Sequence, residues 1–166
     1  MIIRQLTTDD VSHFRQLRSQ SLAEEPTSFG ASYKDFNQKT LEQIKQSIIP
    51  TENGWILGVF SESSQLLGIA GWYRNSTEKT RHKSNIWGVY VIPERRGTGI
   101  GRALIQLIIK KVRKQKEIEQ IQLSVQAGSA ADFLYQSLGF QTFGVEQMAL
   151  KVGSKYINLK HMVYFL

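Results

Sequence analysis

The chain has 166 residues, which suits one domain with a full hydrophobic core, so we expect residues 1–166 to form a single domain. It lacks cysteine, which excludes disulfides, thiolate nucleophiles and cysteine-based zinc sites, and no metal site is predicted. The net charge of +7, from 21 Lys+Arg against 14 Asp+Glu, favours a polyanionic partner such as nucleic acid or a phosphate-rich cofactor.

The first ten residues, MIIRQLTTDD, resemble neither a signal peptide nor a transit peptide. No apolar run approaches the length of a membrane span. We therefore expect a cytoplasmic protein.

The first part of the chain predicts helices followed by a hairpin. Thr8, Asp9 and Asp10 are typical helix-start residues, and Ser61 to Ser64 form a hairpin connection between two apolar strands. The expected elements are a strand at 2–6, a helix to about 23, a turn at 24–30, a helix at about 40–49, and strands at 55–60 and 65–73.

The second part predicts a strand–helix–strand unit over residues 85–126 and a final pair of strands. The expected elements are a polar loop at 75–83, a strand from 85 that stops before Pro93, a helix from about 99 to 115, a strand at 119–125, a helix at 128–138, and strands at 143–152 and 156–166. Because the unit at 85–126 needs a right-handed crossover between parallel neighbours, we expect an α/β chain with a mixed sheet and helices on both faces.

The turn inside this unit carries glycine at every second position, at Gly97, Gly99 and Gly101. Glycine adopts positive φ and lets backbone approach a ligand closely. The first N–H groups of the following helix have no intrahelical partner, so they form an anion site suited to phosphate. The excess of positive charge is concentrated between Arg95 and Lys116, which favours a local anion site. The glycine spacing alone is equally compatible with a turn that binds no ligand.

Two known phosphate motifs do not fit this turn. A P-loop requires Lys-Ser/Thr after its glycines, and a Rossmann fingerprint would place Arg102 or Leu104 at its third glycine. The pattern Arg96-x-x-Gly99-x-Gly101 instead resembles motif A of the GNAT superfamily of N-acetyltransferases.

A second segment also resembles that family. Ala131-x-x-Leu134-Tyr135 followed by Gly139-Phe140 is similar to motif B, although Gly128 stands where the family usually has Asn. The resemblance covers nearly the whole chain. It implies the GNAT fold, with a central mixed sheet of about seven strands and helices on both faces.

The resemblance implies acetyl-CoA as cosubstrate, with its pyrophosphate on the glycine turn and its pantetheine paired to the preceding strand. It also implies that Tyr135 protonates the departing thiolate. A half-buried packing role for Tyr135 is the alternative, and we favour catalysis. The implied cofactor-binding residues are Val89, Tyr90, Val91, Arg96, Gly97, Thr98, Gly99, Ile100, Gly101 and Arg102.

The predicted reaction is direct attack of a primary amine on the thioester of acetyl-CoA. A polyamine, an amino acid, an aminoglycoside-like antibiotic and a protein N-terminus or lysine all stay open as acceptors. We expect Glu25, Phe29, Trp72 and Tyr73 to bind the acceptor. The strand before the turn lacks the carboxylate that this family often supplies as base, so ordered water, His82 or the Glu24–Glu25 pair could take the proton, with water preferred.

Two other functions stay open from the sequence. One is a non-catalytic acyl-CoA-binding or sensor domain on the same fold, and the other is a basic nucleic-acid-binding module, for which no recognised motif is present. A homodimer is possible, but nothing in the chain decides it.

Overall fold

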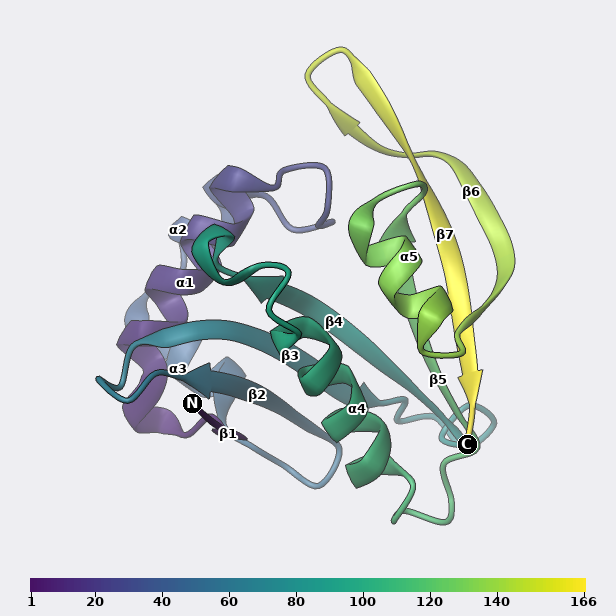
Figure 1. Cartoon of the computed structure of the whole chain (residues 1–166), viewed down its shortest axis with the longest axis horizontal. Coiled ribbons are helices and arrows are strands. Elements are labelled where there is room, and N and C mark those ends of the chain that lie inside the picture. The colour runs from purple at the N-terminus through teal and green to yellow at the C-terminus, as the bar shows by residue number, and fades with distance from the viewer.

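The computed structural model describes residues 1–166 as one seven-stranded sheet with helices on both faces (Figure 1). The strands are β1 (Ile2–Gln5), β2 (Gly54–Phe60), β3 (Leu66–Arg74), β4 (Lys83–Val91), β5 (Gln120–Gln126), β6 (Gln141–Val152) and β7 (Lys155–Phe165). The α-helices are α1 (Val11–Glu24), α2 (Tyr33–Asn37), α3 (Leu41–Ile48), α4 (Ile100–Val112) and α5 (Ala130–Ser137), with short 3-10 turns η1 (Thr8–Asp10) and η2 (Pro93–Arg95).

The strand order in the sheet is β1-β2-β3-β4-β5-β7-β6. All neighbouring strands are antiparallel except β4 and β5, which are parallel and are joined through α4. The predicted mixed sheet and its parallel strand–helix–strand unit are therefore confirmed.

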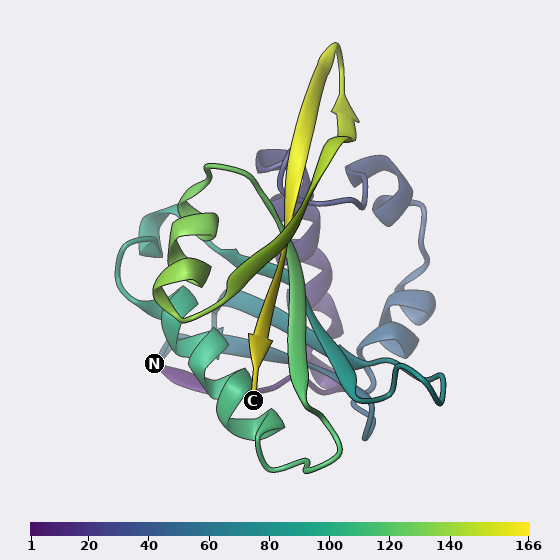
Figure 2. The ribbon, with the colours of Figure 1, turned by 90° about the vertical axis from the view of Figure 1, so that its right-hand side faces the viewer.

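The sheet separates two hydrophobic cores. Fourteen buried residues pack α1, α2 and α3 against one face, and nineteen pack α4 and α5 against the other. Figure 2 shows α4 and α5 on one side of the strands and the purple helices on the opposite side. On β4, Trp87 and Tyr90 face the α1 side, whereas Ile86, Val89 and Val91 face the α4 side. Both layers therefore meet at β4.

The parallel strands β4 and β5 pair over only three residues and then diverge (Figure 1). Their register stops at Asn85 opposite Gln122. Just beyond this point β4 carries a bulge, where the pairing with β3 shifts between Ile69 and Gly71 and Gly88 adopts φ +62°. A bulge bends and twists its strand, which accounts for the divergence. The edge of β4 that faces β5 is left without a strand partner after Asn85.

Some predicted bounds were wrong. The five-residue helix α2 was not predicted, although Ser32 caps it by accepting a hydrogen bond from the Asp35 N–H at 3.0 Å. Helix α5 starts at Ala130 because Gly128, expected inside it, has φ +76°. Helix α4 ends at Val112, the last buried residue of its apolar face, so residues 113–115, which the prediction had included, lie beyond it. None of the helices combines the length and apolarity needed to cross a bilayer.

Candidate active site

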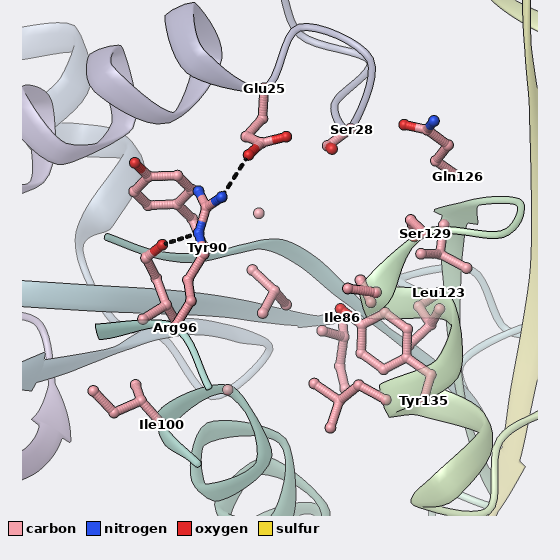
Figure 3. Close-up of a pocket in the computed structure, with 18 of the residues that line it drawn as sticks. Glu25, Ser28, Ile86, Tyr90, Arg96, Ile100, Leu123, Gln126, Ser129 and Tyr135 are labelled. Atoms are coloured by element: carbon pink, nitrogen blue, oxygen red, sulfur yellow. Dashed lines mark hydrogen bonds and ion pairs between the residues drawn. The ribbon is translucent and has the colours of Figure 1, made fainter. Parts of the chain in front are cut away.

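A cavity of about 510 Å³ opens where β4 and β5 diverge. Its walls come from β4, the glycine turn (residues 96–101), the start of α4, β5, α5 and the α1–α2 loop (residues 25–32). Every residue predicted to bind the cofactor lines it except Thr98, whose hydroxyl donates to the Arg95 carbonyl at 2.7 Å and so holds the turn. Figure 3 shows Glu25 and Ser28 on the loop side, with Gln126, Ser129 and Tyr135 on the opposite side.

The glycine turn presents backbone to this cavity. Gly97 and Gly99 have φ of +73° and +87°, and a Cβ at either position would meet nothing within 4 Å. Gly99 is the N-cap of α4, no side chain caps the helix, and the first intrahelical bond runs from the Ala103 N–H to the Gly99 carbonyl. The N–H groups at the start of α4 are therefore free to bind an anion, and positive φ explains why glycine is needed.

Gly101 has a different role from the other two glycines. A Cβ there would lie 3.4 Å from the Leu134 side chain of α5. The small residue therefore lets α4 and α5 approach closely beside the cavity.

Arg96 connects the α1–α2 loop to the end of β4 beside the cavity (Figure 3). Its Nε donates to the Val91 carbonyl at 3.1 Å, and its Nη1 donates to Glu25 Oε1 at 2.8 Å. Its guanidinium lies 5.5 Å from the Tyr90 ring centroid. The Tyr90 hydroxyl donates in turn to Glu24, and this hydrogen bond lowers the pKa of that carboxyl. The end of α1 is thus fastened to the glycine turn.

Tyr135 lies on α5, is 5% exposed and lines the cavity. Its ring packs edge-on against Phe140 at 5.7 Å, and burial raises the pKa of its hydroxyl well above the ordinary value. The phenol therefore stays protonated at neutral pH, as a proton donor must. Figure 3 shows the ring projecting from α5 into the space beside β4.

Gly128, which stands where the family usually has Asn, has φ +76° and contributes its backbone to the start of α5. The Gly128 N–H donates to Asp132 Oδ2 at 2.9 Å, while Lys160 of β7 makes an ion pair with the same oxygen at 2.7 Å. Ser129 caps α5 by accepting from the Asp132 N–H at 3.2 Å. These contacts hold the start of α5, and with it Tyr135, against the sheet.

The residues predicted to bind the acceptor fall into two groups. Glu25 and Phe29 line the cavity together with Ser28. Trp72 and Tyr73 do not line it and belong to a separate, shallower pocket of about 440 Å³ beside Ile48. Trp72 is fully buried and stacks on the Trp55 ring at 5.0 Å, so it is a core residue.

The residues considered as bases also lie apart. His82 precedes β4 at the end remote from the glycine turn and does not line the cavity. Glu24 accepts from Tyr90 and Gln20, and Glu25 pairs with Arg96. Of the three, only Glu25 borders the cavity.

Sequence reasoning missed a polar chain on the β5 side of the cavity. Ser124 lines the cavity, and its Oγ lies 2.9 Å from His161 Nδ1. His161 Nε2 lies 3.0 Å from Glu146 Oε2. A carboxylate can only accept, so Glu146 holds the proton on Nε2 and leaves Nδ1 to accept from the Ser124 hydroxyl. The alternating pattern of β5 places Ser124 on its polar face, but its partners come from β6 and β7.

The comparisons with known proteins agree with this geometry. The family model described as acetyltransferase (GNAT) domain matches residues 3–162. The acetyltransferase of the GNAT family from Streptococcus pneumoniae superposes with a TM-score of 0.86 at 20% identity, covering 99% of this chain and 99% of that one. Salmonella typhimurium yncA, solved with its cofactor acetyl-CoA, has a TM-score of 0.80 at 20% identity, covering 99% of this chain and 93% of that one.

A third similar structure is the ribosomal-protein-alanine N-acetyltransferase from Brucella melitensis, with a TM-score of 0.77 at 22% identity and 100% of each chain covered. A search of curated proteins found no match. The fold and the family model together place the chain among the acetyltransferases. The chain belongs to the GNAT family of acetyltransferases, whose members use acetyl-CoA and acetylate amines.

Proposed function

We propose that this protein transfers the acetyl group of acetyl-CoA directly to a primary amine within the cavity between β4 and β5. The observation that carries the proposal is the joint lining of one cavity by the glycine turn, the unpaired edge of β4 and the Tyr135 hydroxyl. The free N–H groups at the start of α4 bind the pyrophosphate. The open edge of β4 pairs with the pantetheine as an added strand would, which directs the thioester toward the end of the cavity nearest Asn85.

The proposed chemistry needs a neutral amine. For a lysine-like amine with a pKa of about 10.4, only about one molecule in 2,500 is neutral at pH 7, which corresponds to about 4.6 kcal/mol. The neutral amine attacks the thioester carbonyl, and a backbone N–H of β4 stabilises the oxyanion that forms. The carbon–sulfur bond then breaks, and Tyr135 donates its proton to the departing thiolate.

We propose that Ser124, His161 and Glu146 accept the proton from the amine. Ser124 Oγ takes that proton while passing its own to His161 Nδ1, and Glu146 stabilises the imidazolium that results. His161 and Glu146 are both partly exposed, so the proton can leave to solvent. This route replaces the strand carboxylate that the chain lacks. It also explains how an amine is deprotonated in a cavity that has no free carboxylate nearby.

Two measurements test the proposal. Acetyl-CoA should raise the melting temperature, because its binding stabilises the folded state by about 2.7 kcal/mol at a concentration of 100 times its Kd. Release of free thiol from acetyl-CoA, screened over a panel of primary amines, should depend on enzyme and amine together. Stabilisation by acetyl-CoA without thiol release for any amine would favour a non-catalytic acyl-CoA-binding domain, and no stabilisation at millimolar acetyl-CoA would refute the cofactor assignment.

A further inference from the structure

Arg18 is a buried cation without an anionic partner. It lies on α1, is 6% exposed, and takes part in no ion pair. Its side chain makes one long hydrogen bond, from Nη1 to Ser21 Oγ at 3.4 Å. The Ser21 hydroxyl itself donates a hydrogen bond to the Arg18 carbonyl at 2.7 Å. Burial lowers the pKa of Arg18 to about 10, so the guanidinium is still charged at neutral pH.

The other buried charged side chains of this chain are paired. Asp10 accepts two hydrogen bonds from Arg4, each of 2.7 Å, and Asp132 pairs with Lys160 at 2.7 Å. A buried charge without a partner is costly, because desolvation is not offset by Coulomb attraction. Arg18 is thus the exception among the buried charged side chains.

The guanidinium stands directly behind the acceptor side of the cavity. It lies 4.5 Å from the Phe29 ring centroid and 5.9 Å from that of Trp87. A Cβ at Gly88, the bulge residue of β4, would come within 3.6 Å of Nη1. Phe29, Trp87 and Gly88 all line the cavity. Arg18 does not itself line the cavity; it lies immediately behind these three residues, next to the point where β4 and β5 separate.

The unpaired N–H groups of Arg18 are not fully enclosed. Trp72 Nε1 is the sole fully buried side-chain nitrogen or oxygen that has no hydrogen-bond partner. The unpaired N–H groups of Arg18, at Nε and Nη2, must therefore retain some access to solvent. A guanidinium carries its N–H donors in a planar fork. That fork fits the two oxygens of a carboxylate.

We propose that the acceptor is a small amine that carries a carboxylate, as an α-amino acid does, and that Arg18 binds this carboxylate while the amine faces the thioester. The proposal rests on the acetyl transfer proposed above and names its acceptor class. A polyamine or an aminoglycoside-like compound would bring further positive charge toward Arg18 and would be repelled. A protein N-terminus has a peptide bond in place of the carboxylate.

The test compares matched acceptors in the wild-type enzyme and in variants. The common L-α-amino acids and their carboxamides differ only in the group that Arg18 would bind. A charge-assisted bidentate contact should make kcat/KM about 10- to 100-fold higher for the acids. Arg18→Met should abolish that preference, with little change for the carboxamides. Arg18→Lys should retain part of it, because lysine keeps the charge but lacks the fork.

Arg15→Met is the matched control, since it removes the same charge from the same helix at a residue whose guanidinium does not lie against the Phe29 or Trp87 ring. It should leave the preference for acids unchanged. Arg18→Met should also unfold at an equal or higher temperature than the wild-type protein, because it removes an unpaired buried charge. Clear destabilisation by Arg18→Met would identify a structural cation and would overturn the proposal.

Measurements of binding and of turnover distinguish a failure of this proposal from a failure of the acetyl transfer on which it rests. Calorimetry with L-α-amino acids on the CoA-loaded protein should show binding that Arg18→Met weakens and Arg15→Met does not. Such binding without acetylation would refute acetyl transfer while leaving the carboxylate site in place. Acetylation of acids and carboxamides at equal rates, or binding that does not depend on Arg18, would overturn the carboxylate site.

Discussion

The two sides of the cavity are built in different ways. The side that we assign to the acetyl donor consists of one continuous stretch, from Val89 on β4 to Arg102 on α4, and its glycine turn presents backbone groups. The acceptor side consists of side chains from the α1–α2 loop, β4 and β5, and these are supported by Arg18 on α1 and by His161 on β7.

This difference has a physical reason. In the proposed complex, phosphate and pantetheine are bound through N–H and C=O groups, so the donor side needs a particular backbone path more than particular side chains. An acceptor is recognised through charge and shape, which only side chains supply. Substitutions on the acceptor side should therefore change which amine reacts while leaving acetyl-CoA binding intact. The following experiments test that separation.

The largest effect is expected at the donor side. Gly99→Val places a β-branched residue at φ +87°, where the backbone meets the phosphate, although the site itself has open space. We expect acetyl-CoA affinity by calorimetry to fall by at least about 100-fold, with the fold retained. Gly153→Val is the control, because Gly153 also has positive φ, at +61°, and open space, but lies in the β6–β7 turn. Equal affinity in the two variants would show that the glycine turn is only structural.

Tyr135 tests the chemical step alone. Tyr135→Phe keeps the ring against Phe140 and removes the hydroxyl. General acid catalysis is typically worth about 10²–10⁴-fold, and a thiol is already a tolerable leaving group, so kcat should fall by about 100-fold with little change in acetyl-CoA affinity. The deficit should shrink for an acyl donor with a more acidic thiol. Tyr156→Phe, on the exposed β6–β7 hairpin, should behave as wild type. An unchanged kcat in Tyr135→Phe, when chemistry limits turnover, would leave Tyr135 a packing residue.

The proposed proton route should give a smaller loss. His161→Gln removes the base behind Ser124, but water can replace it in part because the site is partly exposed, so we expect kcat to fall by about tenfold. Ser124→Ala should cause a similar loss, and the double variant should be no worse than either single one. His82→Gln, which changes a residue outside the cavity, should retain activity. A loss confined to His82→Gln would show that His82 is the base.

The smallest effect concerns the charges around the donor side. Arg95 and Arg102 line the cavity beside the glycine turn and lie at the start of the basic segment. If they meet the 3′-phosphate of CoA, dephospho-CoA should bind up to about fivefold more weakly, as expected for exposed charge pairs. The difference should decrease as salt is added. An identical melting shift for CoA and dephospho-CoA at low salt would exclude this contact.

Much of the donor side was predictable because its information is local. A β-branched run, a proline, alternating glycines and an apolar stripe at helical spacing all lie within residues 86–112, and each constrains its own backbone. The cavity accordingly contains almost every residue predicted there. The predictions that failed concern a short element and a contact between distant parts of the chain. Helix α2 has too few residues for periodicity, and Trp72 ends a strand like a pocket residue but faces Trp55 in the core.

The sequence by itself determined the strand–turn–helix unit, the positive φ of Gly97 and Gly99 and the apolar faces, since these follow from the conformational preferences of neighbouring residues. Only the tertiary structure decided the acceptor side. Ser124 meets His161 through the β5–β7 register, His161 meets Glu146 through the β6–β7 register, and Arg18 reaches the bulge at Gly88 through the packing of α1 on the sheet. Such contacts depend on how distant segments pack, and no local sequence pattern encodes them.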